Sequence, residues 1–242
     1  MADLTLVIGN MNYSSWSMRP WVLLAQLGIP FDKVKLRFHS AEWDAQIARW
    51  SPSRLVPVLW RGEQSVWDSL AIMETLNEWY PERGVWPREA AARAFARSAA
   101  AEMHSGFRDL RVNMPMNIRA SHPGKGMNAA VQANIDRIEA LWAEARRRFG
   151  AGGPFLFGEF CAADAMYAPV VMRFRTYAVA LSAESAKYCE AMRASAGVRA
   201  WVEESSRETE VVAEDEPYLN SSVAPAPDKG ARGQAPASPQ SP

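Results

Sequence analysis

The chain contains few of the residues that build metal centres and disulfide frameworks. Among its 242 residues there are two cysteines and three histidines, and the histidines lie too far apart in sequence for a local metal-binding motif. No charge dominates, because lysine plus arginine and aspartate plus glutamate both number 27. A balanced charge argues against a broad nucleic-acid or anionic-membrane surface. We therefore expect no bound metal, no nucleic-acid partner and no membrane partner.

Long apolar runs are also missing. No stretch approaches the ~18 apolar residues that span a bilayer. The first residues, MADLTLVIGNMNY, show no basic region followed by an apolar segment, which is the pattern of a signal peptide. A cytoplasmic location is the expectation. With 48% hydrophobic and 22% charged residues, the composition is that of an ordinary folded protein.

Three parts follow one another along the chain. Residues 1–81 alternate strand and helix patterns and predict a small mixed α/β domain. Its expected strands lie at 4–8, 31–38, 56–60 and 64–66, its helices at 15–27 and 68–79, and the stretch between 39 and 55 reads as irregular. Residues 82–94 read as a linker. Residues 220–242 are rich in proline, alanine and serine and predict a disordered tail.

Residues 95–219 predict an all-helical domain. Apolar residues recur there at spacings of three and four, which is the period of an amphipathic helix. The expected helices lie at 95–114, 132–149, 162–180, 183–195 and 197–207.

The loop Ser14-Ser15-Trp16-Ser17, between the first strand and the first helix, is a candidate for chemistry. On local sequence, one serine caps the helix. Alternatively, a hydroxyl faces a cleft at the strand's C-terminal end, where the helix N-terminus favours an anion. Thioredoxin-type domains carry Cys-x-x-Cys in this loop, and serines there exclude thiol–disulfide exchange. A serine could instead donate a hydrogen bond to a ligand's thiolate and so lower the pKa of that thiol.

Two dipeptides add further binding candidates. A cis bond between Val56 and Pro57 would turn the Val56 backbone outward to pair with an extended peptide, although an ordinary edge-strand proline is the simpler interpretation. Asp68-Ser69 reads as a helix cap. The functional alternative is that free N–H groups beside Ser69 bind a carboxylate while Asp68 receives an ammonium group, which together describe an α-amino acid.

In this order the motifs resemble the cytosolic glutathione transferases. The resemblance covers about residues 4–216 and is carried by SSWSMRPWVLLAQLGIPF, SPSRLVPVLWRG, VWDSLAIMETLNEWYPERGVWP and FLFGEFCAADAMYAPVVMRF. It implies a thioredoxin-like α/β N-terminal domain, an all-α C-terminal helical domain and a homodimer. Among the classes, the serine-type, zeta-like proteins look nearest, and some of these isomerise maleylacetoacetate.

The resemblance also implies roles for individual residues. Ser14 would stabilise the glutathione thiolate as the catalytic residue. Glutathione would be bound by Ser15, Val56, Pro57, Asp68 and Ser69. The electrophile's side of the cleft would be built from Met103, His104, Phe107 and Arg108. Here the alternative is that Met103 and Phe107 are core residues and that His104, Arg108 and Arg111, on one helix face, form a solvated or subunit-facing surface.

Three positions depart from the family pattern. Trp16 stands where the zeta-like proteins have a cysteine, which weakens the case for maleylacetoacetate isomerisation. Leu55 replaces a glutamine, so Arg54 or His39 would have to anchor the glycyl carboxylate of glutathione. Cys161 replaces the serine or threonine that caps the helix containing Asp164, and Asp164 is expected to stabilise the fold rather than to act in catalysis.

The expected function is that of a detoxifying glutathione transferase, in which Ser14 activates the thiol for attack on a small electrophile. Two alternatives stay open. One is a glutathione-dependent cis–trans isomerase of the maleylacetoacetate type. The other is a non-catalytic module that keeps the fold for ligand binding or protein interaction.

Overall fold

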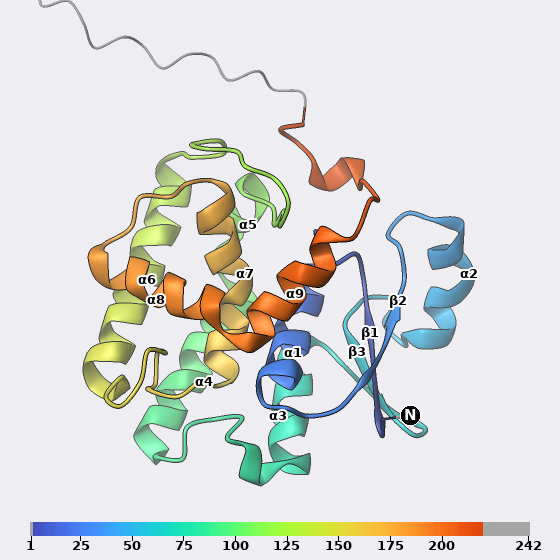
Figure 1. The fold of residues 1–242 in the computed structure, drawn as a ribbon, viewed down its shortest axis with the longest axis horizontal. Coiled ribbons are helices and arrows are strands. Elements are labelled where there is room, and N and C mark those ends of the chain that lie inside the picture. The colour runs from blue at the N-terminus through green and yellow to red at the C-terminus, as the bar shows by residue number, and fades with distance from the viewer. Residues whose placement is uncertain (1, 220–242) are drawn as a thin grey trace, which may run out of the picture.

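The computed structural model describes residues 2–219. A four-stranded sheet with its helices forms the N-terminal part, and helices alone form the larger C-terminal part (Figure 1). The tail expected at 220–242 lies outside the described residues. The strands are β1 (Leu4–Ile8), β2 (Asp32–Lys35), β3 (Val58–Arg61) and β4 (Gln64–Trp67). The helices of this first part are α1 (Ser15–Gln26), α2 (Ala41–Trp50) and α3 (Ser69–Trp79).

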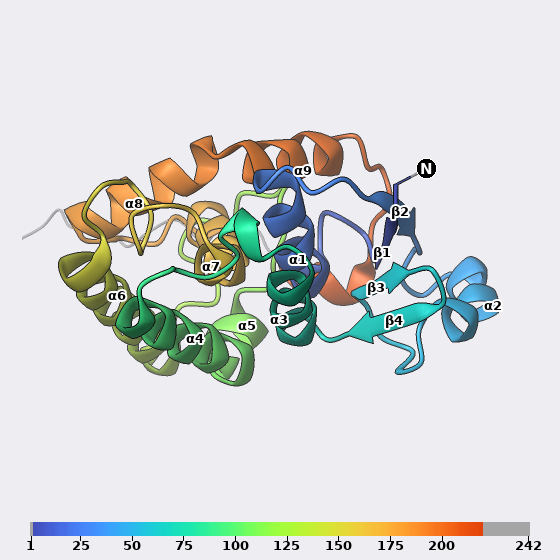
Figure 2. The ribbon, with the colours of Figure 1, turned by 90° about the horizontal axis from the view of Figure 1, so that it is seen from below.

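The sheet has the strand order β2-β1-β3-β4, with β1 parallel to β2 and antiparallel to β3. Alternate residues of β1 point to opposite faces: Leu4, Leu6 and Ile8 enter the main core, whereas Val7 joins a small cluster that contains Ile47 of α2. Figure 2 shows α1 and α3 on one face of the sheet and α2 on the other. This confirms the predicted thioredoxin-like α/β domain.

Helix α2 corrects the prediction of irregular structure between the second and third strands. Ser40 begins it, because its hydroxyl accepts a hydrogen bond from the Trp43 N–H at 3.1 Å. Only Ile47 in this helix is fully buried. Trp43, Ile47 and Trp50 do recur at helical spacing and pack in one small cluster, but the helix is short and its other residues are polar or alanine, so the prediction missed this weak period.

The C-terminal part is a helical domain, as predicted. Its helices are α4 (Ala90–Ser105), α5 (Arg108–Asn113), α6 (Ala129–Phe149), α7 (Ala162–Thr176), α8 (Ala183–Ala194) and α9 (Ala196–Ser206). The single helix expected at 95–114 is wrong. The chain breaks between α4 and α5, where Phe107 adopts a left-handed conformation with φ of 54°.

Helix α7 runs through the centre of this domain and is buried along nearly all of its length. Trp142 of α6 packs edge-on against Tyr167, Phe174 and Tyr188 around it, with ring centroids 4.7 to 5.7 Å apart. Such T-shaped contacts between aromatic rings add stability beyond the burial of their area.

The two parts are joined through α1, which packs on α7 and α9 (Figure 1). Gly197 lets α9 approach closely, because a Cβ atom there would lie 2.6 Å from the Val22 carbonyl oxygen. Its N–H donates to the Gln26 side chain at 2.9 Å, and Trp21 meets Trp201 edge-on. Helix α1 is therefore held between the sheet and the helical domain.

Candidate functional site

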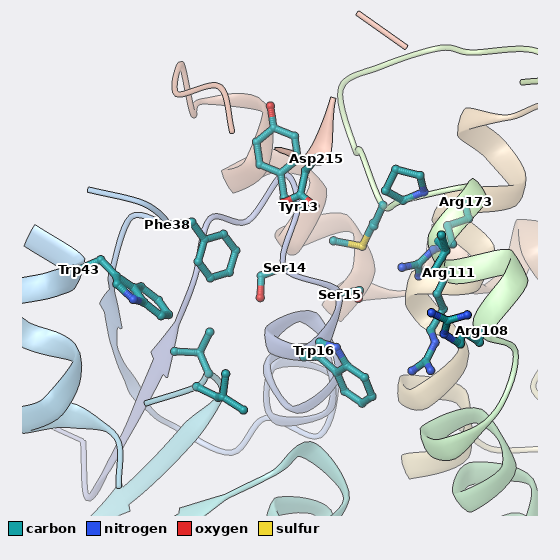
Figure 3. Close-up of a pocket in the computed structure, with 15 residues that line it drawn as sticks. Tyr13, Ser14, Ser15, Trp16, Phe38, Trp43, Arg108, Arg111, Arg173 and Asp215 are labelled. Atoms are coloured by element: carbon teal, nitrogen blue, oxygen red, sulfur yellow. The ribbon is translucent and has the colours of Figure 1, made fainter. Parts of the chain in front are cut away.

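A cleft of about 570 Å³ lies between the two domains at the N-terminus of α1 (Figure 3). We refer to it as the interdomain cleft. The sheet domain lines it with Tyr13, Ser14, Ser15, Trp16, Phe38, Trp43, Leu55 and Val56. The opposite wall comes from the C-terminal part and consists of Arg108, Arg111, Val112, Pro115, Met116, Arg173 and Asp215.

Ser14 is both the cap of α1 and a lining residue of the cleft. Its hydroxyl accepts a long hydrogen bond from the Ser17 N–H at 3.4 Å and donates to Ser17 Oγ at 2.7 Å. Ser17 Oγ in turn accepts the Gly9 N–H at 3.1 Å, which ties the loop to the end of β1. Capping and a place in the cleft, which the sequence offered as alternatives, therefore occur together.

Ser15 occupies the first turn of α1 and also lines the cleft. Its hydroxyl has no hydrogen-bond partner within residues 2–219, although the residue is only 8% exposed. Ser14 would have to turn its hydrogen away from Ser17 to reach a ligand, whereas the Ser15 hydroxyl is already free to do so.

The loop that carries Ser14 is anchored by the segment that follows α9. The Glu208 carboxylate, 7% exposed as a residue, accepts the N–H groups of Met11 and Asn12 at 2.9 and 3.0 Å. Lys35 pairs with the same carboxylate at 3.0 Å. A single side chain from the C-terminal part thus accepts hydrogen bonds from two buried N–H groups of the loop that carries Ser14.

Replacing Glu208 with alanine is expected to lower the free energy of unfolding by about 2–3 kcal/mol, because two buried N–H groups lose their acceptor. Urea denaturation followed by circular dichroism measures the change. Glu203→Ala is the matched control, since the exposed Glu203–Arg207 pair contributes little. Equal effects of the two substitutions would contradict the anchoring role of Glu208.

Of the Val56–Pro57 pair, Val56 is the residue that lines the cleft. The Val56–Pro57 bond is cis, and half-buried Val56 lines the cleft beside exposed Leu55. Arg54 and His39, the candidates for anchoring a glycyl carboxylate, are exposed and both have positive φ.

Asp68 and Ser69 stand at the N-terminus of α3 and are not among the lining residues. Asp68 caps the helix by accepting the Leu70 N–H at 2.8 Å, and its second oxygen lies 2.7 Å from His104 Nε2. Ser69 Oγ is buried without a partner in the described residues. A ligand carboxylate is one group that would satisfy it, since unpaired buried polar atoms are uncommon.

The four residues expected to bind the electrophile occupy different places in the structure. Arg108 lines the cleft. Met103 and Phe107 are buried in the main core, where the alternative interpretation put them. His104 binds Asp68 and contacts the Trp16 ring edge-on, with centroids 5.3 Å apart. None of these three residues is among the described residues that line the cleft.

Arg173 and Asp215 line the cleft without having been singled out by the sequence. Arg173 did leave a signal, because a cation within the apolar segment of residues 165–174 must have a reason to be buried. Asp215 left none, since it sits among other acidic residues near the end of the described chain. Burial raises the pKa of the Asp215 carboxyl.

Two family models match the chain. The N-terminal domain of glutathione S-transferase matches residues 13–79, and the C-terminal domain of glutathione S-transferase matches residues 128–204. The chain belongs to the glutathione S-transferase family. The first match covers the serine loop and the sheet domain apart from β1, and the second covers α6, α7, α8 and most of α9. No match was found among curated proteins.

Solved structures of this family share the fold. A glutathione transferase homologue from Burkholderia gl BGR1, with bound glutathione, is 24% identical, with 85% of this chain and 99% of that chain covered at a TM-score of 0.63. A glutathione S-transferase from Xylella fastidiosa is 21% identical, with 84% and 98% covered at 0.59. Ure2p in complex with glutathione is 19% identical, with 83% and 98% covered at 0.60.

Within residues 2–219, no group of three or more histidine, cysteine, aspartate or glutamate side chains could hold a metal ion. Over the same part of the chain, no helix is both long and apolar enough to cross a membrane.

Proposed function

We propose that this protein is a glutathione transferase that activates the glutathione thiol with a serine hydroxyl of the α1 loop. Ser14 is the catalytic residue in this proposal, and Ser15 shares the site. The hydroxyl donates a hydrogen bond to the thiolate, which favours the ionised form and lowers the pKa of the thiol. The observation that carries the proposal is that both hydroxyls line one cleft at the N-terminus of a helix.

The surrounding groups suit a bound tripeptide. The backbone of Val56 pairs with the cysteinyl part, and the N-terminus of α3 with Asp68 and Ser69 receives the γ-glutamyl end. Support comes from the unpartnered Ser69 hydroxyl and from the exposed side chain of Asp68. The positive end of the α1 dipole adds to the stabilisation of a thiolate at Ser14.

The reaction needs little further chemistry from the protein. The thiolate sulfur attacks an electrophilic carbon held against the second-domain wall, and a carbon–sulfur bond forms as the leaving group departs or as a double bond accepts a proton from water. A thiol with a pKa of about 8.5 is only a few per cent ionised at neutral pH, so a fall of ~2 units makes most of it reactive. A homodimer, as the family resemblance implies, belongs to this proposal.

Incubation of the protein with glutathione and 1-chloro-2,4-dinitrobenzene tests the proposal. Enzyme-dependent loss of free thiol, in step with release of chloride, is the expected result. Turnover of maleylacetoacetate with no loss of thiol would instead favour the isomerase. Binding of glutathione with neither reaction would place the protein among non-catalytic members of the fold.

A further inference from the structure

The second-domain wall of the interdomain cleft is strongly cationic. Arg108 and Arg111 of α5 and Arg173 of α7 point into the cleft from one side (Figure 3). Within the described residues none of the three forms an ion pair with an acidic side chain. Among the described residues that line the cleft, Asp215 is the one acid, and Figure 3 places it near Tyr13, away from Arg108.

Arg173 is a buried cation with an unsatisfied donor. Only 3% of the residue is exposed. Its Nε donates to the Met114 carbonyl oxygen at 2.8 Å, while Nη1 is buried without a partner in residues 2–219. Burial, with help from Arg111, lowers the pKa of this guanidinium to about 10, so it remains charged at neutral pH. A buried charge of this kind is costly unless an anion meets it.

Arg19 and Arg111 lie against the ring of Trp16, which lines the same cleft. The guanidinium of Arg19 lies 4.0 Å from the centroid of the Trp16 ring, and that of Arg111 lies 5.4 Å from it. Arg19 is fully buried and none of its three side-chain nitrogens has a partner in the described residues. Burial, with help from Arg173 and Arg111, lowers the pKa of the Arg19 guanidinium to about 9, and all three cations add to the positive potential of the cleft.

The same wall also has an apolar part. Val112, Pro115 and Met116 line the cleft next to the arginines, and Val112 is exposed. A ligand that matches both parts has an apolar body and one planar anionic end. Guanidinium groups bind carboxylates through two parallel hydrogen bonds, which makes a carboxylate the best match for this end.

We infer that Arg173, Arg111 and Arg108 form a carboxylate-binding subsite for the second substrate, so that the electrophile attacked by glutathione carries a carboxylate on an apolar body. That the ligand is the electrophile attacked by glutathione rests on the proposed function. The carboxylate-binding subsite itself does not. The γ-glutamyl carboxylate of glutathione is assigned to the N-terminus of α3, and the candidates for its glycyl carboxylate, Arg54 and His39, also belong to the sheet domain, so neither carboxylate is assigned to these arginines.

Binding of benzoate and benzamide to the glutathione-saturated protein tests the inference by calorimetry. The two probes have the same ring and nearly the same shape, and only benzoate is charged. Benzoate is expected to bind at least about 10-fold more tightly, the effect of one charge-assisted hydrogen bond. The advantage is expected to disappear in Arg173→Gln and to fall by about 3-fold in Arg111→Gln.

Arg193→Gln serves as the control, because Arg193 is an exposed cation of the same domain that does not line this cleft. It should leave the benzoate preference unchanged. Arg111→Gln keeps the test valid if Arg173→Gln does not fold, since Arg111 is only partly buried. Equal affinity for the two probes in the unchanged protein would overturn the inference.

Two outcomes separate this inference from the proposed function. If the arginine substitutions raise the pKa of bound glutathione and leave the benzoate preference intact, the cations act on the thiolate and the subsite is wrong. If glutathione does not bind at all but benzoate is still preferred by the glutathione-free protein, the subsite stands and the transferase proposal fails.

Discussion

Replacing Asp164 with alanine is expected to lower the free energy of unfolding by about 3–5 kcal/mol, because three buried donors each lose their acceptor at about 1–3 kcal/mol apiece. The fully buried Asp164 carboxyl accepts the N–H groups of Leu156 and Cys161 at 3.1 and 2.9 Å and the Tyr188 hydroxyl at 3.1 Å. The substitution leaves all three donors unpaired inside the helical domain. Urea denaturation measures the loss.

Asp136→Ala is the matched control, because Asp136 is an exposed acid on α6 whose contact is a hydrogen bond from Gln132. No measurable change is expected there. A loss below about 1 kcal/mol in Asp164→Ala would contradict the structural role, since surface substitutions usually fall in that range.

Asp164 also predicts a pH dependence of stability. Burial raises the pKa of this carboxyl from 3.8 to about 6, against the opposing effect of its hydrogen bonds. The folded state therefore holds the proton more tightly than the unfolded state, so this contribution to stability is present below about pH 4 and is lost as the pH rises through 6. Asp164→Asn should flatten the fall in stability between pH 4.5 and 7.5, as measured by urea denaturation at both pH values.

Replacing Ser14 with alanine is expected to reduce the rate of thiol conjugation at pH 7 by roughly 25-fold, because a pKa that returns by ~2 units leaves only a few per cent of the thiol ionised. Glutathione affinity is expected to change little, since the hydroxyl contacts the thiolate rather than the peptide backbone. Initial rates at saturating glutathione measure the effect. Ser15→Ala is expected to give a smaller loss.

Ser14 also caps α1, and the loss of a cap costs about 1 kcal/mol. Ser40→Ala controls for this, because Ser40 caps α2 in the same way and does not line the cleft. It should lower stability without lowering the rate. A full loss of rate in Ser15→Ala with none in Ser14→Ala would move the catalytic role to the hydroxyl that has no partner in the described residues.

Much of the fold follows from local sequence patterns, and the exceptions have physical reasons. The strand alternation and the helical period locate the two domains, because each element buries one face. Helix α2 was missed although Trp43, Ile47 and Trp50 follow the helical period, because it is short and only Ile47 is fully buried. The break at Phe107 escapes because its left-handed backbone depends on how the chain packs between α4 and α5, not on a glycine or proline at that position.

Some residues of the site could be predicted from local sequence and others could not. The serine loop and Val56 could be placed from sequence because they lie in short motifs at the ends of strands. Arg173 could not, because it lies in a different domain from Ser14 and reaches the cleft only through the packing of α7 on α1. The local motif around Asp68 could not predict its pairing with His104, because the two residues lie 36 positions apart in the sequence.

A pH titration of the thiolate absorbance of glutathione bound to this protein tests the central claim most directly, with Ser14→Ala titrated alongside. A pKa about 2 units below the ordinary value of the thiol, returning towards that value in the variant, is the predicted result. Bound glutathione whose thiol titrates as it does in water would contradict serine activation.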